Sequence, residues 1–498
     1  MSITGPGSIT ATNLLAQNNM SNQLNTLSEQ LGTGEAATTY SGLQTQAGLA
    51  VQLSAQLAAI NGYSNTASTI GTTLSIAQST LSQIGAVGTD VQQAINLQGG
   101  FSLDNTGQTA TQESAASYLD QILSLLNTQI GSNYLFSGSA TNQPSVAPTN
   151  EILNGNGTQD GLVQVIQNQL QADEGVNDTG RLSTAVTGSQ LTLSSDGSPF
   201  GFQLSGVTSS LTGGSASGPT GSPPTITVNL GANTAAGDTV TFDLALPDGS
   251  TQDITLTATA TSPPGANQFA IGASAGATST NLQTALNSAI GSLAQTALPA
   301  ASAIAAANNF FSDPPQVPNG PPYDTATALM NGTTANTVQW YTGGNSGTPL
   351  QTVTAQVGPS LTVAYGMQAD EPAITSLLAS VGVLAATTYS AGNPNAQASY
   401  QALCAQVTKN LSGSSGTQSI DDIEASIANV QTTVANATTV NTQTQTTLQD
   451  MLQGFEGVNQ NQIGEDILTL QNNLSASMSV TARLAQLSLV NYLAPTTG

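Results

Sequence analysis

Basic and metal-binding side chains are almost missing from this chain. Its 498 residues include three Lys and Arg together and no His, whereas Asp and Glu number 27. Binding to nucleic acid or to an anionic membrane surface needs clustered cations, so the sequence argues against both partners. Without His, and with Cys404 as the single cysteine, neither a zinc site of the usual ligands nor a His-based triad can form. We therefore expect no enzyme activity, no metal and no cofactor.

Long apolar runs and a targeting segment are missing as well. No stretch approaches the ~20 apolar residues of a membrane-spanning helix. The amino-terminal residues lack the basic region and the apolar stretch of a secretory signal peptide, which taken alone suggests a cytoplasmic protein. Charged residues make up 6% of the chain, against about a quarter in an average soluble protein. Ser, Thr, Asn and Gln supply the polarity instead.

Helical periodicity marks the amino-terminal part of the chain. Leu24, Leu27 and Leu31 fall at spacings of three and four residues, which indicates an amphipathic helix. Residues 45–97 repeat this spacing and predict a helix roughly 80 Å long at ~1.5 Å per residue. Because that exceeds what one globular core covers, we expect another long helix to pair with it. A further helix is predicted over residues 118–130.

The carboxyl end mirrors this pattern. Apolar stripes at helical spacing run through residues 423–434 and 463–478. The intervening stretch 434–450 is nearly all Thr, Gln, Asn and Ala, so it is weak as a heptad seam. An ordinary bundle within one subunit explains part of this pattern. It does not explain why both ends of the chain are amphipathic, since chain ends usually fray.

The sequence predicts mainly strands and turns in the middle of the chain, from about 150 to 350. It contains short alternating runs: SQLTLSS (189–195), TITVNL (225–230), TVTFDLAL (239–246) and QDITLTAT (252–259). The PDGS at 247–250 predicts a hairpin turn between the last two runs. The Ala-rich segment 281–310 predicts one or two short helices. We expect one or two inserted domains with much β structure.

The two ends of the chain resemble bacterial flagellins, in particular alphaproteobacterial members, and the related hook–filament junction protein. The resemblance covers roughly 1–150 and 335–498, and several motifs occur in the family's order. These are LNTLSEQLGTGEAATTYSGL (24–43), QIGSNYLFSGSATNQPSVAP (129–148), WYTGGNSG (340–347), SLTVAYGMQADEPAITSLLASVGVLA (360–385) and NLSASMSVTARLAQLSLVNYL (473–493). The middle segment resembles no family that we can name.

The resemblance implies a multidomain fold in which both termini form an α-helical coiled-coil or bundle core. Residues 1–40 and 455–498 are then terminal helices of an inner filament tube, which fold on polymerisation. Residues 41–150 and 335–454 form a helical core domain with a small β element, and 151–334 form the inserted β-rich (α+β) surface domains. The polymerisation interface is expected at apolar residues of both terminal helices: Leu15, Leu24, Leu27, Leu31, Ile463, Ile467, Leu470, Leu474, Met478, Leu484 and Leu487.

The resemblance also implies partners and a location. The partners are further copies of this chain in a helical homopolymer, the flagellar export apparatus with an export chaperone, and the junction and cap proteins. Export through the flagellum's own channel needs no cleaved signal peptide, so the expected location is the extracellular flagellum. O-linked glycans are expected on the Ser- and Thr-rich middle segment. No nucleic acid and no membrane belong to this set.

Other interpretations stay open at this stage. The chain is a filament subunit for swimming motility or the hook–filament junction protein, and its length and large insert favour the filament. From another class, the insert is a surface adhesion or glycan-binding module, although isolated aromatics such as Trp340 and Tyr341 form a poor sugar platform. Arg483 is either a buried, paired cation or an exposed one. Cys404 is expected to be an inert small hydrophobe.

Overall fold

The structure is a computed structural model of the chain, and it describes residues 6–97, 101–413 and 416–492. The chain divides into two compact units. The first combines residues 1–70, 356–363 and 432–498, and the second combines 71–355 and 364–431. Helices and small sheets occur together, so the protein is a multidomain α+β protein. The domain boundaries expected from the sequence stay a prediction.

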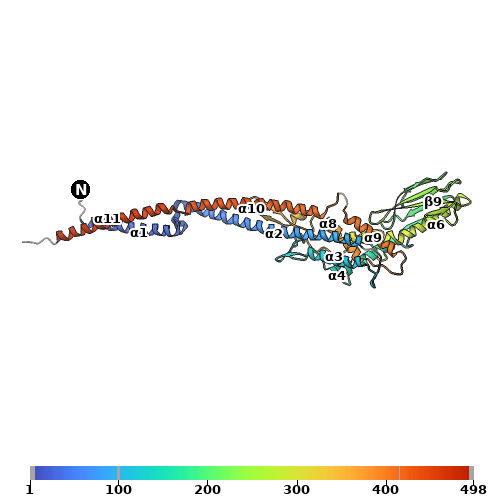
Figure 1. Cartoon of the computed structure of the whole chain (residues 1–498), viewed down its shortest axis with the longest axis horizontal. Helices are drawn as coiled ribbons and strands as arrows, with labels where there is room; N and C mark the ends of the chain where they lie inside the picture. Colours follow the sequence, from blue (N-terminus) through green and yellow to red (C-terminus); the bar gives the residue numbers. More distant parts are fainter. Residues whose placement is uncertain (1–5, 98–100, 414–415, 493–498) are drawn as a thin grey trace, which may run out of the picture. The chain divides into compact units, whose positions relative to one another are not determined.

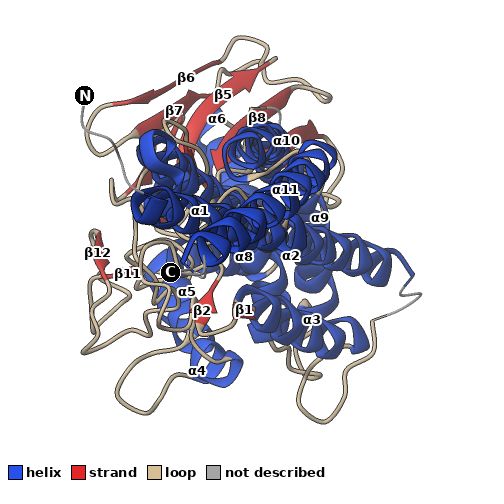
Figure 2. Ribbon diagram, turned by 90° about the vertical axis from the view of Figure 1, so that its left-hand side faces the viewer, coloured by secondary structure: helices blue, strands red, loops and turns tan. Residues whose placement is uncertain are grey.

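The first unit is built from long helices. It contains α1 (Pro6–Thr33), η1 (Tyr40–Gln46), α11 (Gln460–Tyr492) and parts of α2 (Ala47–Leu97) and α10 (Ile420–Glu456). Figures 1 and 2 both show α1 lying along α11. The two helices run antiparallel, because Gln17 of α1 is bonded to Thr481 of α11 while Ala36, beyond the other end of α1, is bonded to Glu456.

A small apolar cluster joins α2 and α10 within this unit. Its buried members are Leu53, Ile60 and Leu448, and the partly buried residues packed on them are Leu57, Tyr63, Leu452 and Phe455. The stretch 434–450 is part of the continuous helix α10. Its buried positions are Val434, Ala437, Asn441 and Leu448. Asn441 donates its side-chain amide to the backbone oxygen of Val357 at 2.9 Å, so a polar side chain occupies one position of the buried stripe.

Threonine and serine take the place of charges on the surfaces of these helices. On α10, the hydroxyls of Thr438, Thr442 and Thr446 each donate to the backbone carbonyl four residues earlier. Ser475 and Thr481 of α11 do the same. A hydroxyl bonded in this way is satisfied by its own helix. The helix surface is therefore polar in composition without needing ionic partners.

The helices of the second unit surround a largely apolar layer. They are α3 (Ala110–Leu126), α4 (Thr149–Asn154), α5 (Leu162–Glu174), α7 (Ala297–Phe310), α8 (Pro372–Ala386) and α9 (Ala396–Leu411), together with the remaining parts of α2 and α10. Helix α8 packs against α3, α7 and α9, and most of its residues are buried. Among the described residues no single helix is long and apolar enough to span a membrane, although the bent pair of α6 (Ala275–Gln295) and α7 meets both criteria together.

The predicted helices agree with the structure except at some ends. The long helix expected over 45–97 is confirmed as α2, residues 47–97. The helix expected over 118–130 is correct as far as Leu126 but begins earlier, at Ala110. A capping box at Thr109 and Gln112 starts it there. Residues 129 and 130 belong to a strand instead.

The inserted part of the second unit is a β-sandwich with one covering helix. One sheet has the order β3-β4-β7-β6 and the other β10-β9-β8-β5. The strands are β3 (Leu182–Thr187), β4 (Gln190–Ser195), β5 (Gln203–Ser209), β6 (Ser215–Thr220), β7 (Thr225–Asn229), β8 (Thr239–Ala245), β9 (Thr251–Thr259) and β10 (Gln268–Ala270). All pairs are antiparallel except β9 with β10. The β8–β9 pair confirms the hairpin predicted at PDGS.

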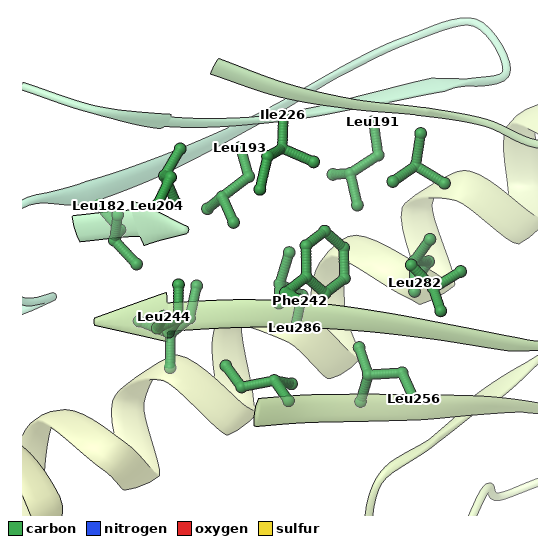
Figure 3. Close-up of a cluster of buried hydrophobic side chains, with 14 of the residues drawn as sticks. Leu182, Leu191, Leu193, Leu204, Ile226, Phe242, Leu244, Leu256, Leu282 and Leu286 are labelled. Atoms are coloured by element: carbon green, nitrogen blue, oxygen red, sulfur yellow. The ribbon is translucent and has the colours of Figure 1, made fainter. Parts of the chain in front are cut away.

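The core of this sandwich lies between the two sheets and α6 (Ala275–Gln295). Figure 3 shows Leu191, Leu193 and Ile226 of one sheet facing side chains of the other sheet and of the helix. The facing residues include Phe242, Leu256, Leu282 and Leu286. Alternating buried positions along β4, β7 and β8 give each strand one apolar face.

Short elements complete the fold. They are β1 (Gln129–Ile130), β2 (Asn133–Tyr134), β11 (Gln316–Pro318), β12 (Leu329–Asn331), η2 (Pro349–Thr352), β13 (Thr354–Gln356) and β14 (Thr362–Ala364). The six strands among them form three two-stranded sheets, β1-β2, β11-β12 and β13-β14.

Candidate functional site

The pair of terminal helices holds most of the residues predicted at an assembly interface. Ile463 is buried on α11. Six more of the predicted interface residues are half-buried: Leu24, Leu27, Ile467, Leu470, Leu474 and Leu484. The hydrogen bonds from Gln17 to Thr481 at 3.0 Å and to Ser477 at 3.4 Å fix how the two helices align. These seven apolar residues therefore lie in or beside the α1–α11 contact of a single chain.

Three of the predicted residues lie on the outside of the pair instead. Leu15 is 63% exposed, Met478 is 53% exposed and Leu31 is 39% exposed. The side chain of Leu487 lies outside the described residues. A hydrophobic side chain left this open gains free energy if another surface covers it, at roughly 25 cal/mol per Å² of apolar area.

Sequence reasoning missed further exposed apolar residues on the same two helices. Leu14, Leu468 and Val480 are each more than half exposed. Each lies one or two positions from a predicted residue, off the periodic stripe. These residues could have been found in the sequence, because each is an apolar residue outside the apolar stripe of its amphipathic helix. We call the six residues Leu14, Leu15, Leu31, Leu468, Met478 and Val480 the exposed apolar set.

A groove of about 600 Å³ runs between the two helices. Its α1 side is lined by Asn22, Gln23, Thr26, Leu27 and Gln30, and its α11 side by Asp466, Thr469, Leu470 and Asn473. Asp466 is the single charged residue of this lining. The groove therefore offers amide and hydroxyl groups beside two leucines, a surface that fits an uncharged protein segment better than an ionic ligand.

A second place of interest lies in the other unit, where three distant segments meet. Ser137 pairs with Gln368, Gly138 with Gly344 and Val146 with Tyr341 in isolated β-bridges. Trp340 beside them is fully buried, stacks edge-on against Phe311 at 5.5 Å, and donates its indole N–H to the Ser312 carbonyl at 2.9 Å. Three of the motif segments quoted from the sequence thus form one packed structure.

Carboxyl groups gather at the edge of this structure. Burial, together with the nearby charges of Asp313 and Glu371, raises the pKa of Asp370 to about 6. Burial also raises the pKa of Glu371, whose carboxylate accepts a bond from Gln418 at 2.9 Å. Burial therefore favours the protonated forms of Asp370 and Glu371. Across the described residues, however, no three His, Cys, Asp or Glu side chains are placed to bind a metal ion.

The single cysteine and the three cations lie on separate segments of the described structure, except that Cys404 and Lys409 share α9. Cys404 is buried, and burial raises the pKa of its thiol, which keeps it protonated and unreactive. Arg181 is nearly buried and paired with Asp196 at 2.8 Å. Lys409 and Arg483 are exposed on α9 and α11. The three cations thus lie in separate places and form no basic patch.

No family model matches this chain, and no curated protein matches it either.

Proposed function

We propose that this chain is a flagellin-like structural subunit that polymerises into an extracellular filament for swimming. The observation that carries the proposal is the exposed apolar set on the paired terminal helices. Burying one Leu contributes about 1.5–3 kcal/mol, so several such residues per subunit favour a lattice that covers them. A head-to-tail contact that does not close on itself generates a helical filament.

Two further features support this proposal. Three of the motif segments that resemble flagellins are packed together around Trp340 and the Ser137–Gln368 bridge. The insert forms a separate β-sandwich core, which suits a domain displayed outside a helical core. In this proposal both termini form that core as a helical coiled coil or bundle, the chain leaves the cell through the flagellar export apparatus, and it is not an enzyme.

The first test removes the terminal helices. We expect deletion of residues 1–31 or 463–498 to leave a soluble, folded central fragment that does not polymerise. Light scattering and electron microscopy after seeding with full-length filaments measure this. A truncated chain that still forms filaments of normal diameter would contradict the proposal.

A sharper test changes only exposed side chains. Leu15→Asp and Leu468→Asp place a charge on the outside of the helix pair, where each parent leucine is more than 60% exposed. We expect the secondary structure of the monomer to persist and polymerisation to stop. Val176→Asp, at a residue 68% exposed in the other unit, is the matched control and should assemble normally. Chain found only in short segments at the filament base would assign the junction role instead.

A further inference from the structure

A cavity of about 440 Å³ opens beside Arg181, where the β-sandwich meets helix α5. Its lining comes from three segments that are distant in sequence. They are the end of α5 with the turn after it (between 174 and 179), the start of β3 with the end of β4, and the loop between 324 and 327. The volume lies within the range of small-molecule binding sites, which is roughly 300–1,000 Å³.

The lining of this cavity is acidic, although a guanidinium lies within it. Glu174, Asp196 and Asp324 contribute three carboxylates, and Arg181 contributes one cation. The Arg181 side chain is 5% exposed and donates to Asp196 Oδ2 at 2.8 Å and to the Asp324 carbonyl at 3.0 Å. Its Nε donates to the Ala172 carbonyl. The cation is therefore already bonded to protein oxygens, and two of the three carboxylates remain without a partner of opposite charge.

Glu174 is the least compensated of these carboxylates. It is half-buried, and burial together with the charges of Asp178 and Asp173 raises the pKa of its carboxyl. Among the described residues none donates a hydrogen bond to it. A ligand cation in the cavity would offset the repulsion between these acidic groups.

A hydroxyl without a partner lies in the wall of the same cavity. Ser195 is 4% exposed and belongs to the lining, and its Oγ makes no hydrogen bond. It pairs directly with Leu182 of β3, which also belongs to the lining. Directly paired residues of antiparallel strands carry their side chains on one face. Because an unpaired buried polar group costs free energy, a donor supplied by a ligand would stabilise this wall.

The lining suits an organic cation better than a metal ion or an anion. Within the described part of the chain, no three Asp, Glu, His or Cys side chains are placed to bind a metal ion, and the excess of carboxylates repels anions. Leu182 and the 68% exposed Val176 add apolar surface beside the acceptors. An alkylammonium ion fits both parts, because it carries N–H donors with a positive charge and methylene groups that gain from burial.

We propose that the cavity beside Arg181 binds a small organic amine, whose ammonium group donates to the Glu174 carboxylate and to Ser195 Oγ. Neither acceptor is bonded in the free chain, so the ligand displaces no hydrogen bond of the protein there. The methylene groups of the amine lie against the apolar part of the lining. The site belongs to the insert and not to the terminal helices, so its test does not depend on polymerisation.

The test is isothermal titration calorimetry of the full-length chain with putrescine, a short diamine, at pH 7. At about 0.15 M salt the Debye length is ~8 Å, so diffuse attraction of the amine to the acidic chain is screened. Butanediol, the uncharged counterpart of putrescine, and calcium chloride are the comparison probes. We expect one putrescine to bind per chain and neither comparison probe to compete with it. No binding at millimolar putrescine, equal binding of butanediol, or displacement of putrescine by calcium would overturn the proposal.

Variants separate a binding role from a structural one. Glu174→Gln should weaken putrescine binding by about tenfold or more, because a charged hydrogen bond is lost. Ser195→Ala should weaken it by about threefold to tenfold. It should not lower the free energy of unfolding, since Ser195 Oγ has no partner in the free chain.

Asp253→Asn is the matched control, because this exposed carboxylate of β9 belongs to the same insert but lies outside the cavity. It should bind putrescine as the parent chain does. An equal loss of affinity in Asp253→Asn, or unchanged affinity in both Glu174→Gln and Ser195→Ala, would assign the binding to general attraction by the acidic chain and overturn the proposal.

Discussion

Asp238 is buried and Asp370 is partly buried, and the pKa values of their carboxyl groups shift in opposite directions. At Asp370 burial dominates and the charges of Asp313 and Glu371 add to it, so the pKa rises to about 6. At Asp238 burial acts in the same sense, but backbone N–H donors at Ala235 and Thr212 stabilise the charged form and the pKa falls. The local hydrogen-bond donors, more than burial, separate the two residues.

Replacement of Asp370 should make the protein more stable at neutral pH. Its folded form keeps a proton that the unfolded chain loses near pH 4, so the stability from this proton is complete below about pH 4 and lost by about pH 6. Asp370→Asn removes that loss. We expect about 1 kcal/mol more stability at pH 7, a figure reduced because partial exposure screens the charge, and little change at pH 3. Thermal unfolding followed by the single tryptophan, Trp340, measures it.

The control for this experiment is Asp450→Asn, at an exposed position of α10. It should change the unfolding temperature little. An effect of Asp370→Asn that is the same at pH 3 and at pH 7 would contradict the titration argument.

Two glycines with similar backbones should differ in their tolerance of a methyl group. Gly138 and Gly131 have φ of 58° and 64°, which costs a non-Gly residue about 1–2 kcal/mol. A Cβ at Gly138 would also lie 2.3 Å from the Gly344 carbonyl oxygen, whereas one at Gly131 meets nothing within 4 Å. We expect Gly138→Ala to cost at least ~3 kcal/mol and Gly131→Ala about 1 kcal/mol in urea unfolding. Equal losses would show that the bridge at Gly344 gives way freely.

At the scale of elements, strong periodicity predicted the long helices and several strands, but it did not predict the shorter helices α4, α5, α8 and α9. Runs such as TITVNL and TVTFDLAL became β7 and β8 because alternate residues face the sandwich core. Strand β6, SASGPT, has no apolar alternation, so its pairing with β7 has no local signal. The pairing of β4 with β7 and of β5 with β8, which builds the two facing sheets, depends on contacts distant in sequence.

For the candidate site, spacing located apolar residues of the two terminal helices, and their role at an assembly interface stays a prediction. The stripes containing Leu24, Leu27, Ile467 and Leu470 were found from their spacing, and the structure places them along the α1–α11 contact. The cavity beside Arg181 could not be found in this way. Its lining comes from three segments far apart in sequence, which only their packing brings together. Such tertiary contacts leave no pattern in the local sequence.

Replacing Leu448 at the α2–α10 contact should lower the free energy of unfolding more than replacing Val440 on the exposed face of α10. Leu448 is 8% exposed and packs with Leu53 and Ile60, whereas Val440 is 58% exposed. We expect Leu448→Ala to lower the free energy of unfolding of the first unit by about 2–4 kcal/mol through the cavity it leaves. Val440→Ala should cost less than about 0.5 kcal/mol. Circular dichroism during urea unfolding measures both, and equal losses would mean that this cluster does not stabilise the unit.

For the whole molecule, the shortage of basic residues bears on acid tolerance. At pH 7 each chain carries a formal charge of −24, from 27 carboxylates and three cations. At about pH 2.5 most carboxylates are neutral, so the charge is roughly +4 at most, from those cations and the terminal amine. An ordinary protein of this size would carry dozens of positive charges there. If the chain forms filaments as proposed, we expect them to suit an acidic medium and to remain assembled at that pH.

Light scattering of isolated filaments between pH 5 and pH 2.5 tests this expectation. Dissociation on acidification would contradict it. Adaptation to high salt is the rival explanation, but it usually adds many surface carboxylates, and 27 in 498 residues is few. Drift in composition predicts no particular tolerance of acid.

The placement of the three cations also decides which proteases and reagents can act on the folded chain. Enzymes that cut after Lys or Arg have three candidate bonds, and the Arg181 side chain at one of them is 5% exposed. Lys409 and Arg483 lie within helices, where cleavage is slower than in exposed loops. Cleavage after Arg483 would release only residues 484–498. Apart from the terminal amine, a reagent that reacts with primary amines has one target per chain, Lys409, so labelling there adds a single tag to each subunit.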